Sequence, residues 1–301
     1  MADGILNINK PPGMVSFAVV SLVRRVTGIR RVGHAGTLDP IADGVLPICI
    51  GRATRIVEYL VDAPKSYRAR IRLGVTTDTY DSEGATIATA DPSDVTLQEL
   101  EAALLPFVGE IQQQPPMYSA LKYEGQPLYR YARAGKEVPR EMRTVSIYRL
   151  DLLRYAPPVV ELELECGRGA YVRSLAHDLG QQLGCGAHLE GLTRFKSGPF
   201  SLEDAMSPDQ FVEMAGEHAW PQLLNPVDRV LESWQAALLG EEHTSEARRG
   251  RSLLLTPTRQ DSQDLALDTL CRAYSHEGEF LAILRYRGTG LWHPEKVFAP
   301  L

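Results

Sequence analysis

The stretch GHAGTLDPIADGVLPICIG, residues 33–51, contains a glycine-rich loop that runs directly into an apolar strand. The loop carries two isolated carboxylates, Asp39 and Asp43. Gly36 permits a positive φ and a close approach of the backbone to another group, and Pro40 biases Asp39 toward an extended backbone. We therefore expect the neighbours of Asp39 to aim its side chain.

A structural role is the alternative interpretation of Asp39. Asp followed by Pro is a common pair at the N-cap and first position of a helix, and Gly44 would end such a helix after one turn. The residue pattern alone leaves both interpretations open.

Several chemistries do not fit this loop. It lacks the GxxxxGK[ST] and GxGxxG patterns that cradle phosphates, which argues against nucleotide hydrolysis and dinucleotide binding. A glycosidase needs a second carboxylate roughly 5–10 Å away, and Asp43 is too close in sequence to face Asp39 across a sugar. The four cysteines show neither a CxxC pair nor a His at ligand spacing, so we expect buried thiols rather than a zinc site or disulfides.

The charge of the chain is unevenly distributed. The 301 residues have a net charge of -6. However, residues 1–60 contain seven Lys and Arg against four Asp and Glu, and residues 117–149 contain seven against three. Such basic segments are either solvated faces or nucleic-acid contacts. No apolar run approaches the roughly 20 residues of a membrane span, and the N-terminus lacks a signal-peptide pattern. We expect a cytoplasmic protein that does not associate with membranes.

Hydrophobic periodicity predicts helices and strands that are interspersed without a regular βαβ repeat. Predicted helices follow Ser16, Thr96 and Gly169, with Ser16 as an N-cap and Thr96 paired with Glu99 in a capping box. The pattern predicts an α+β fold with a mixed, largely antiparallel central sheet flanked by helices. The predicted strands are residues 45–50, 68–73, 145–154 and 159–166.

The pattern changes near residue 226, which predicts a large domain at 1–225 and a small β domain at 226–301. The stretch CRAYSHEGEFLAILRY, residues 271–286, predicts a hairpin with its turn at 276–278. The polar stretches 233–250 and 256–264 are predicted to be mobile loops.

Four ordered blocks of sequence closely resemble the TruB family of bacterial tRNA pseudouridine-55 synthases. They are GHAGTLDPIADGVLPICIGRATR (33–55), KSYRARIRLGVTTDTYDSEG (65–84), PPMYSALKYEGQPLYRYARAG (115–135) and GAYVRSLAHDLG (169–180). The segments NINKPPGMVS (7–16) and GCGAHLEGLTRFKSGPF (184–200) extend the resemblance over most of residues 4–225. The remaining residues loosely resemble the family's barrel-like PUA domain, which binds RNA. The resemblance implies the pseudouridine synthase fold, and isomerisation of one T-loop uridine of tRNA without a metal or organic cofactor.

The resemblance also implies roles for individual residues. Asp39 corresponds to the catalytic carboxylate, and Arg173 to the arginine that pairs with it. Whether the carboxylate adds to the sugar or removes the C2′ proton is left open. Tyr67 corresponds to the tyrosine that stacks on the uracil and is the candidate base for its C5 proton. Leu192 corresponds to an apolar contact of the flipped base, and His34 to the residue that fills the gap left by that base.

Further RNA contacts follow from the same resemblance. Lys10 corresponds to a lysine that supports the catalytic loop, and Tyr171 precedes Arg173 at the substrate site. Residues 115–143 correspond to the family's RNA-gripping insertion, which we expect to be mobile in the free protein and to order on RNA. Its basic side chains, interleaved with tyrosines as in a phosphate-binding and stacking surface, are Lys122, Arg130, Arg133, Lys136, Arg140 and Arg143.

Two other functions stay open at this point. One is a tRNA-binding folding chaperone whose catalysis is incidental, and the complete set of Asp39, Tyr67 and Arg173 argues against it. The other is a guide-RNA-dependent synthase that needs partner proteins, and the full insertion together with the short N-terminus favours a stand-alone enzyme instead. We expect a monomer whose partner is the T-stem-loop of tRNA, with no obligatory protein partner.

Overall fold

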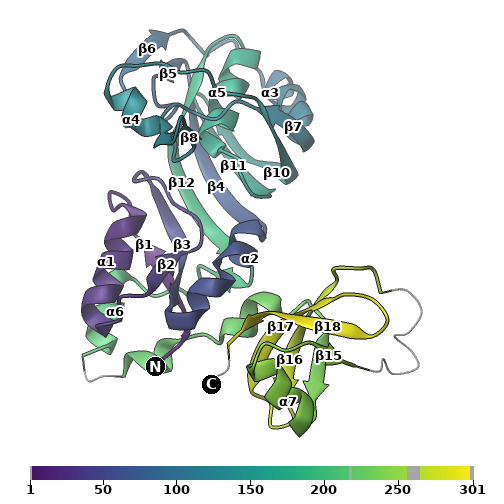
Figure 1. Cartoon of the computed structure of the whole chain (residues 1–301). Helices are drawn as coiled ribbons and strands as arrows, with labels where there is room; N and C mark the ends of the chain where they lie inside the picture. The colour runs from purple at the N-terminus through teal and green to yellow at the C-terminus, as the bar shows by residue number, and fades with distance from the viewer. Residues whose placement is uncertain (1, 217–218, 256–264, 299–301) are drawn as a thin grey trace.

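A nine-stranded mixed sheet forms the centre of the larger part of the molecule (Figure 1). The computed structural model describes residues 2–216, 219–255 and 265–298. The pairing of β3 with β12 is parallel, and the other described pairings of this sheet are antiparallel. The predicted mixed, largely antiparallel sheet is therefore confirmed. The strands follow the order β1 (Gly4–Lys10), β3 (Ala42–Ile50), β12 (Ala187–Ser197), β4 (Lys65–Leu73), β11 (Val159–Cys166), β10 (Arg143–Ala156) and β7 (Gly109–Gln113), with β2 (Val32–His34) on β3 and β13 (Phe200–Ser201) on β12.

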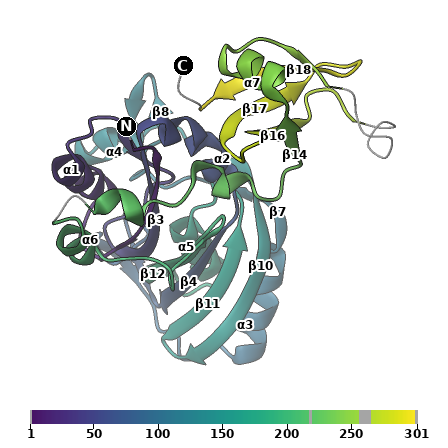
Figure 2. The ribbon, with the colours of Figure 1, turned by 90° about the horizontal axis from the view of Figure 1, so that it is seen from below.

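Four helices pack on this sheet in two groups, and each group has its own hydrophobic core (Figure 2). The first group, α1 (Ser16–Thr27) and α6 (Pro208–Met214), packs with β1 and β3. The second, α3 (Leu97–Leu104) and α5 (Val172–Gln182), packs with β4, β10, β11 and β12. Tyr67 of β4 and Leu192 of β12 contact both cores and therefore mark the junction between them.

Local sequence signals explain several of these elements. On β4, Ala69, Ile71 and Leu73 are buried while the arginines between them are exposed, as the period of two requires. Helix α1 ends at Gly28, which adopts a left-handed φ of 71°. Helix α3 begins with the predicted capping box of Thr96 and Glu99. The predicted N-cap at Ser16 is wrong, because Val15 occupies that position and no side chain caps the helix.

The larger part also carries short elements at its surface. The insertion contains a small hairpin and one short helix, and a second hairpin follows β4. These elements are α2 (Val57–Asp62), β5 (Val75–Thr77), β6 (Thr86–Thr89), β8 (Lys122–Tyr123), β9 (Gln126–Pro127) and α4 (Leu128–Arg133).

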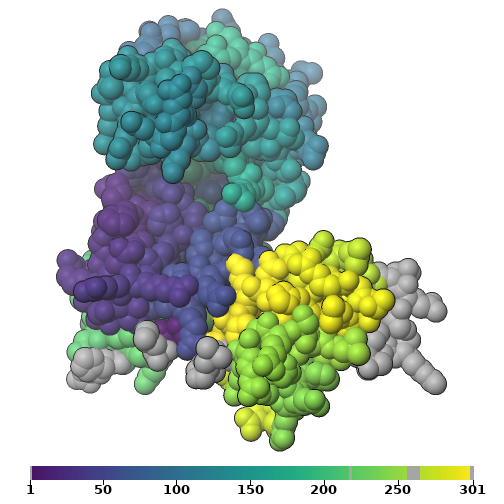
Figure 3. Space-filling view, in the orientation of Figure 1, coloured from purple at the N-terminus to yellow at the C-terminus, as the bar shows by residue number. Residues whose placement is uncertain are grey.

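A separate five-stranded sheet follows near the C-terminus and lies to one side of the rest, against the region of α2 (Figure 3). Its predicted hairpin is confirmed, since β16 (Leu270–Ser275) and β17 (Phe280–Tyr286) pair around the turn at 276–278. Lys296 Nζ donates to the carbonyl oxygen of Arg55 at 2.8 Å, and Phe298 shares an apolar cluster with Ile5 of β1. The elements are β14 (Ala236–Leu239), α7 (Glu241–Arg248), β15 (Leu253–Leu254), β16 (Leu270–Ser275), β17 (Phe280–Tyr286) and β18 (Leu291–Val297).

Two predictions about mobile loops have different outcomes. The stretch 233–250 is not simply a loop, because it contains β14 and α7. The stretch 256–264 lies outside the described residues. Within the described part of the chain, no helix is long and apolar enough to cross a membrane.

Candidate active site

A cavity of about 530 Å³ opens where the two hydrophobic cores meet. Segments far apart in the sequence form its wall: the loop 36–40, the turn 79–83, the insertion and the start of α5. Tyr67 and Leu192 line it from β4 and β12. The structure thus brings together Asp39, Tyr67, Tyr171, Arg173 and Leu192, all of which the sequence resemblance singles out.

Asp39 and Arg173 form an ion pair in this cavity. Arg173 Nε lies 2.8 Å from Asp39 Oδ2, and Arg173 Nη2 donates to Oδ1 at 3.0 Å. The side chain of Arg173 is 4% exposed and that of Asp39 is 32% exposed, so the carboxylate stays open to the cavity while its partner is buried. A turn follows Asp39 at 40–41, but in the described part of the chain the Asp39 carboxylate bonds to Arg173 and to no backbone N–H of that turn, so it does not act as a turn cap.

The electrostatic environment of Asp39 contains opposing effects. Burial raises the pKa of the Asp39 carboxyl group above its ordinary value, the Arg173 guanidinium opposes that rise, and the neighbouring Asp81 carboxylate adds to it. A carboxylate whose proton affinity is raised while an arginine favours its ionised form is suited to act as a nucleophile or a base.

Asp81 was missed by sequence reasoning, although it lies in one of the family-like blocks. Its Oδ2 lies 3.5 Å from Arg173 Nη1. Arg173 Nη1 also donates to the carbonyl oxygen of Thr79 at 3.3 Å, and Arg173 Nη2 donates to that of Tyr118 in the insertion at 2.9 Å. One buried guanidinium therefore joins the loop of Asp39, the turn 79–81 and the insertion.

Arg194 was also missed, and it lines the cavity beside Tyr67, its register partner on β4. It is only 1% exposed, and its guanidinium donates to the carbonyl oxygens of Val45 and Gly36 at 2.7 and 3.1 Å. Burial raises the pKa of Tyr67, and the positive charge of Arg194 opposes that rise. The signal in the sequence was the spacing: Arg194 follows Leu192 by two residues on β12, and alternate side chains of a strand lie on the same face.

Lys10 and His34 lie near the site without lining the cavity. Lys10 is fully buried, and its Nζ donates to the carbonyl oxygens of Pro11 and Met14 at 2.9 and 2.7 Å. Burial lowers the pKa of Lys10 to about 8, while Asp43 and Asp39 oppose the shift. His34 lies on β2, and burial followed by the charge of Arg194 lowers its pKa, which favours a neutral ring.

The basic residues of the insertion fall into three groups. Arg133 lines the cavity, and its guanidinium lies 5.5 Å from the ring centre of Tyr129, which also lines it. Arg140 is half-buried and donates to the carbonyl oxygen of Pro115 at 3.0 Å, so it fastens the base of the insertion. The exposed cations outside the cavity wall are Lys122, Arg130, Lys136 and Arg143.

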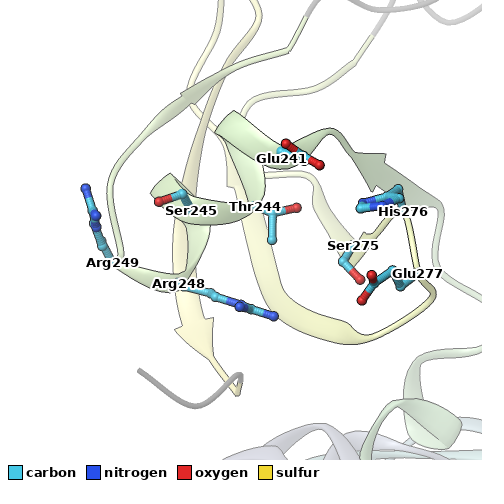
Figure 4. A pocket seen from close by; sticks show the side chains of 8 residues that line it. All are labelled: Glu241, Thr244, Ser245, Arg248, Arg249, Ser275, His276 and Glu277. Carbon is cyan, nitrogen blue, oxygen red and sulfur yellow. The ribbon is translucent and has the colours of Figure 1, made fainter.

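A second cavity, of about 370 Å³, lies between α7 and the turn that joins β16 to β17 (Figure 4). Its lining mixes carboxylates such as Glu241 with arginines such as Arg248 and Arg249. It contains none of the residues that the sequence motifs single out. Among the described residues, no group of three or more His, Cys, Asp or Glu side chains is arranged to hold a metal ion.

Comparisons with known proteins agree with this geometry. Residues 24–172 match the N-terminal domain of the TruB family pseudouridylate synthases, and residues 173–232 match a tRNA pseudouridylate synthase B C-terminal domain. A tRNA pseudouridine synthase B of Dehalococcoides mccartyi is 43% identical over 98% of this chain and 96% of its own length. Proteins with the same name from Thiobacillus denitrificans and Pseudomonas aeruginosa are 45% and 47% identical, over 93% and 79% of this chain and 91% and 79% of their own lengths.

The fold is also that of a solved structure. A chain in a crystal structure of a Cbf5-Nop10-Gar1 complex superposes with a TM-score of 0.75 at 25% identity, covering 99% of this chain and 85% of that one. The superposition includes the five-stranded sheet, which fits a PUA-like domain. By its sequence over nearly its whole length and by its fold, the chain belongs to the TruB family of pseudouridylate synthases.

Proposed function

We propose that this chain isomerises one uridine in the T-loop of tRNA to pseudouridine. Relatives named tRNA pseudouridine synthase B match it over nearly their full lengths. The observation that carries the proposal is the ion pair of Asp39 and Arg173 in a cavity that Tyr67 and Leu192 also line. A carboxylate, a cation, an aromatic ring and an apolar contact are what a single extracted base requires.

The reaction rearranges bonds within one nucleotide. The bond from N1 to C1′ breaks, the uracil turns, and C5 bonds to C1′. C5 then loses its proton while N1 gains one, so neither an oxidant nor a co-reactant is consumed. Because a T-loop base is stacked, the enzyme must first flip it into the cavity. Asp39 either adds to the sugar or removes the C2′ proton, and Arg173 holds its carboxylate in the direction of the reacting carbon for both routes.

Tyr67 and Leu192 are placed to hold the base. Burial raises the pKa of Tyr67, so the neutral phenol predominates near pH 7 and its ring is available for stacking. Transfer of the C5 proton to the hydroxyl requires the phenolate, which Arg194 favours. Tyr67→Phe separates the two roles, since it keeps the ring and removes the base.

The rest of the chain supplies the grip on the RNA. The exposed cations of the insertion suit the phosphates of a T-stem-loop, and we assign residues 1–225 to the catalytic domain and 226–301 to a PUA-like RNA-binding domain. We propose that the chain acts in the cytoplasm, where its tRNA substrate is, as a monomer without an obligatory protein partner.

A guide-RNA-dependent enzyme is the second candidate, since the superposed chain comes from a complex with Nop10 and Gar1. Activity of the isolated chain on a T-stem-loop distinguishes the two functions. The test is tritium release from a T-stem-loop RNA labelled at uridine C5, with wild type and Asp39→Asn. We expect release by wild type and none by the variant, with RNA binding retained by both. Binding without release by wild type would contradict the proposal and favour a chaperone or a guide-dependent enzyme.

A further inference from the structure

Tyr80 occupies a backbone conformation that aromatic residues rarely adopt. Its φ is 66°, in the left-handed region where a side chain of this size is strained. The turn around it is well tied, because Tyr80 N donates to the carbonyl oxygen of Thr77 at 3.3 Å and Leu189 N donates to that of Tyr80 at 3.0 Å. A glycine would adopt this φ without strain. We therefore expect the Tyr80 side chain to make a contact that offsets the strain of its backbone.

That contact is a stack on His177. The two rings are 3.8 Å apart between centroids and are inclined by 14°. Burial, followed by the charge of Arg140, lowers the pKa of His177, so its ring is neutral near pH 7. Within the described part of the chain, His177 Nδ1 is buried without a hydrogen-bond partner. The imidazole thus acts through its ring face, which a phenyl ring could replace.

The stack lies one helical turn from the ion pair of the site. His177 follows Arg173 by four residues on α5, so both lie on the same side of that helix. The neighbours of Tyr80 on either side contact Arg173, Thr79 through its carbonyl oxygen and Asp81 through its carboxylate. Neither Tyr80 nor His177 lines the cavity, so neither is placed to touch the base.

The orientation of Asp81 depends on the same turn. Its Oδ1 accepts hydrogen bonds from Thr79 Oγ1 at 2.6 Å and from the backbone N–H of Glu83 at 3.1 Å, which directs Oδ2 toward Arg173. Moving the turn relative to α5 would therefore change how Arg173 is held, and with it the direction of the Asp39 carboxylate.

We propose that Tyr80 and His177 form a positioning pair, which clamps the turn 79–81 to α5 and so fixes Arg173 against Asp39. This role rests on the proposed function of the site. The pair acts on the chemical step through Arg173 and does not contribute to RNA affinity.

Four variants test the pair. Tyr80→Gly removes the ring but suits the backbone, and His177→Ala removes the other ring. We expect each to lower the single-turnover rate about 10-fold, with the dissociation constant for a T-stem-loop RNA unchanged, and the double variant to be no slower than either. His177→Phe keeps a ring in place and should retain the wild-type rate. Tyr155→Ala is the matched control, because it removes a half-buried aromatic side chain from β10 that does not line the cavity.

A second measurement does not depend on activity. In ¹⁵N NMR spectra, the Nη2 protons of Arg173, which bond to Asp39 and to the carbonyl oxygen of Tyr118, should exchange with solvent about 10-fold faster in Tyr80→Gly and His177→Ala than in wild type or His177→Phe. Wild-type rates and wild-type exchange in both ring-deletion variants would overturn the positioning role. If wild type releases no tritium, the proposed function fails and the exchange measurement alone decides whether the pair fixes Arg173.

Discussion

Replacing Arg194 by methionine should abolish most activity while leaving the protein folded. The side chain is buried, and its hydrogen bonds go to the carbonyl oxygens of Gly36 and Val45 rather than to a carboxylate. Gly36 lies three residues before Asp39 in the catalytic loop. The guanidinium therefore ties the catalytic loop to β12, the strand that carries Arg194.

The expected change in stability follows from two opposing contributions. A hydrogen bond from a charged donor contributes about 1.5–3 kcal/mol, so losing two costs about 3–6 kcal/mol. Removing a buried charge recovers several kcal/mol of desolvation. The free energy of unfolding of Arg194→Met should therefore fall by no more than about 3 kcal/mol. A misplacement of about 1 Å at the reacting carboxylate costs about 100-fold in rate, and this is the loss that we expect.

Two assays check these values: urea unfolding for stability, and single-turnover tritium release at saturating T-stem-loop RNA for the rate. Arg70→Met is the matched control, because this arginine of β4 is exposed, pairs with Glu190 and should leave the rate unchanged. A folded Arg194→Met protein whose rate lies within threefold of wild type would refute the reasoning, since the loop would then keep its place without Arg194.

Three further predictions concern the same region. Gly44→Ala should lower the free energy of unfolding by at least about 3 kcal/mol in urea unfolding, because the φ of Gly44 is 102° and an added Cβ would stand 2.2 Å from the carbonyl oxygen of Arg194. Gly33→Ala is the control and should leave the stability unchanged, because nothing lies within 4 Å of its added Cβ. Equal stabilities of the two variants would contradict this prediction. The rate should fall at acidic pH as Asp39 is protonated. Because the Asp81 carboxylate raises the pKa of Asp39, Asp81→Asn should move this fall to lower pH in a rate–pH profile. A move of the fall to higher pH would contradict the prediction. In limited proteolysis, tRNA should protect residues 115–143 from cleavage. Arg140→Ala should speed their cleavage in the free protein, because Arg140 donates a hydrogen bond to the carbonyl oxygen of Pro115 at the start of the insertion. Cleavage rates that change neither with tRNA nor with Arg140→Ala would count against a mobile insertion that Arg140 holds.

The sequence predicts best those elements whose pattern depends on neighbours along the chain. On β11, Val160, Leu162 and Leu164 are buried as their alternation indicates. The glutamates between them face the opposite side, where Glu163 pairs with Arg68 of β4. The capping box of α3 was predicted for the same reason, since it depends on contacts within about one turn of helix.

Contacts between distant segments could not be read in this way. Ser16 has the composition of an N-cap, but its hydroxyl bonds to both the N–H and the carbonyl oxygen of Leu38, 22 residues away. Lys10 and Arg194 are among the largest fully buried side chains, although charged residues are seldom buried without a partner. Only the folded sheet, in which β12 lies between β3 and β4, brings the carbonyl oxygens that Arg194 binds to its guanidinium.

These distant contacts explain how a loop can hold a catalytic carboxylate precisely enough for chemistry. The loop 35–41 has no strand ladder of its own, yet four of its residues are tied to other segments. Arg194 binds Gly36, Ser16 binds Leu38, Arg173 binds Asp39, and Gly13 N donates to the carbonyl oxygen of Pro40 at 2.8 Å. The partners come from β12, α1, α5 and the segment after β1, so the loop can shift only if several of these contacts break together. Substitutions at the partners should therefore lower the rate, and the largest losses should come from those partners that hold the loop closest to Asp39.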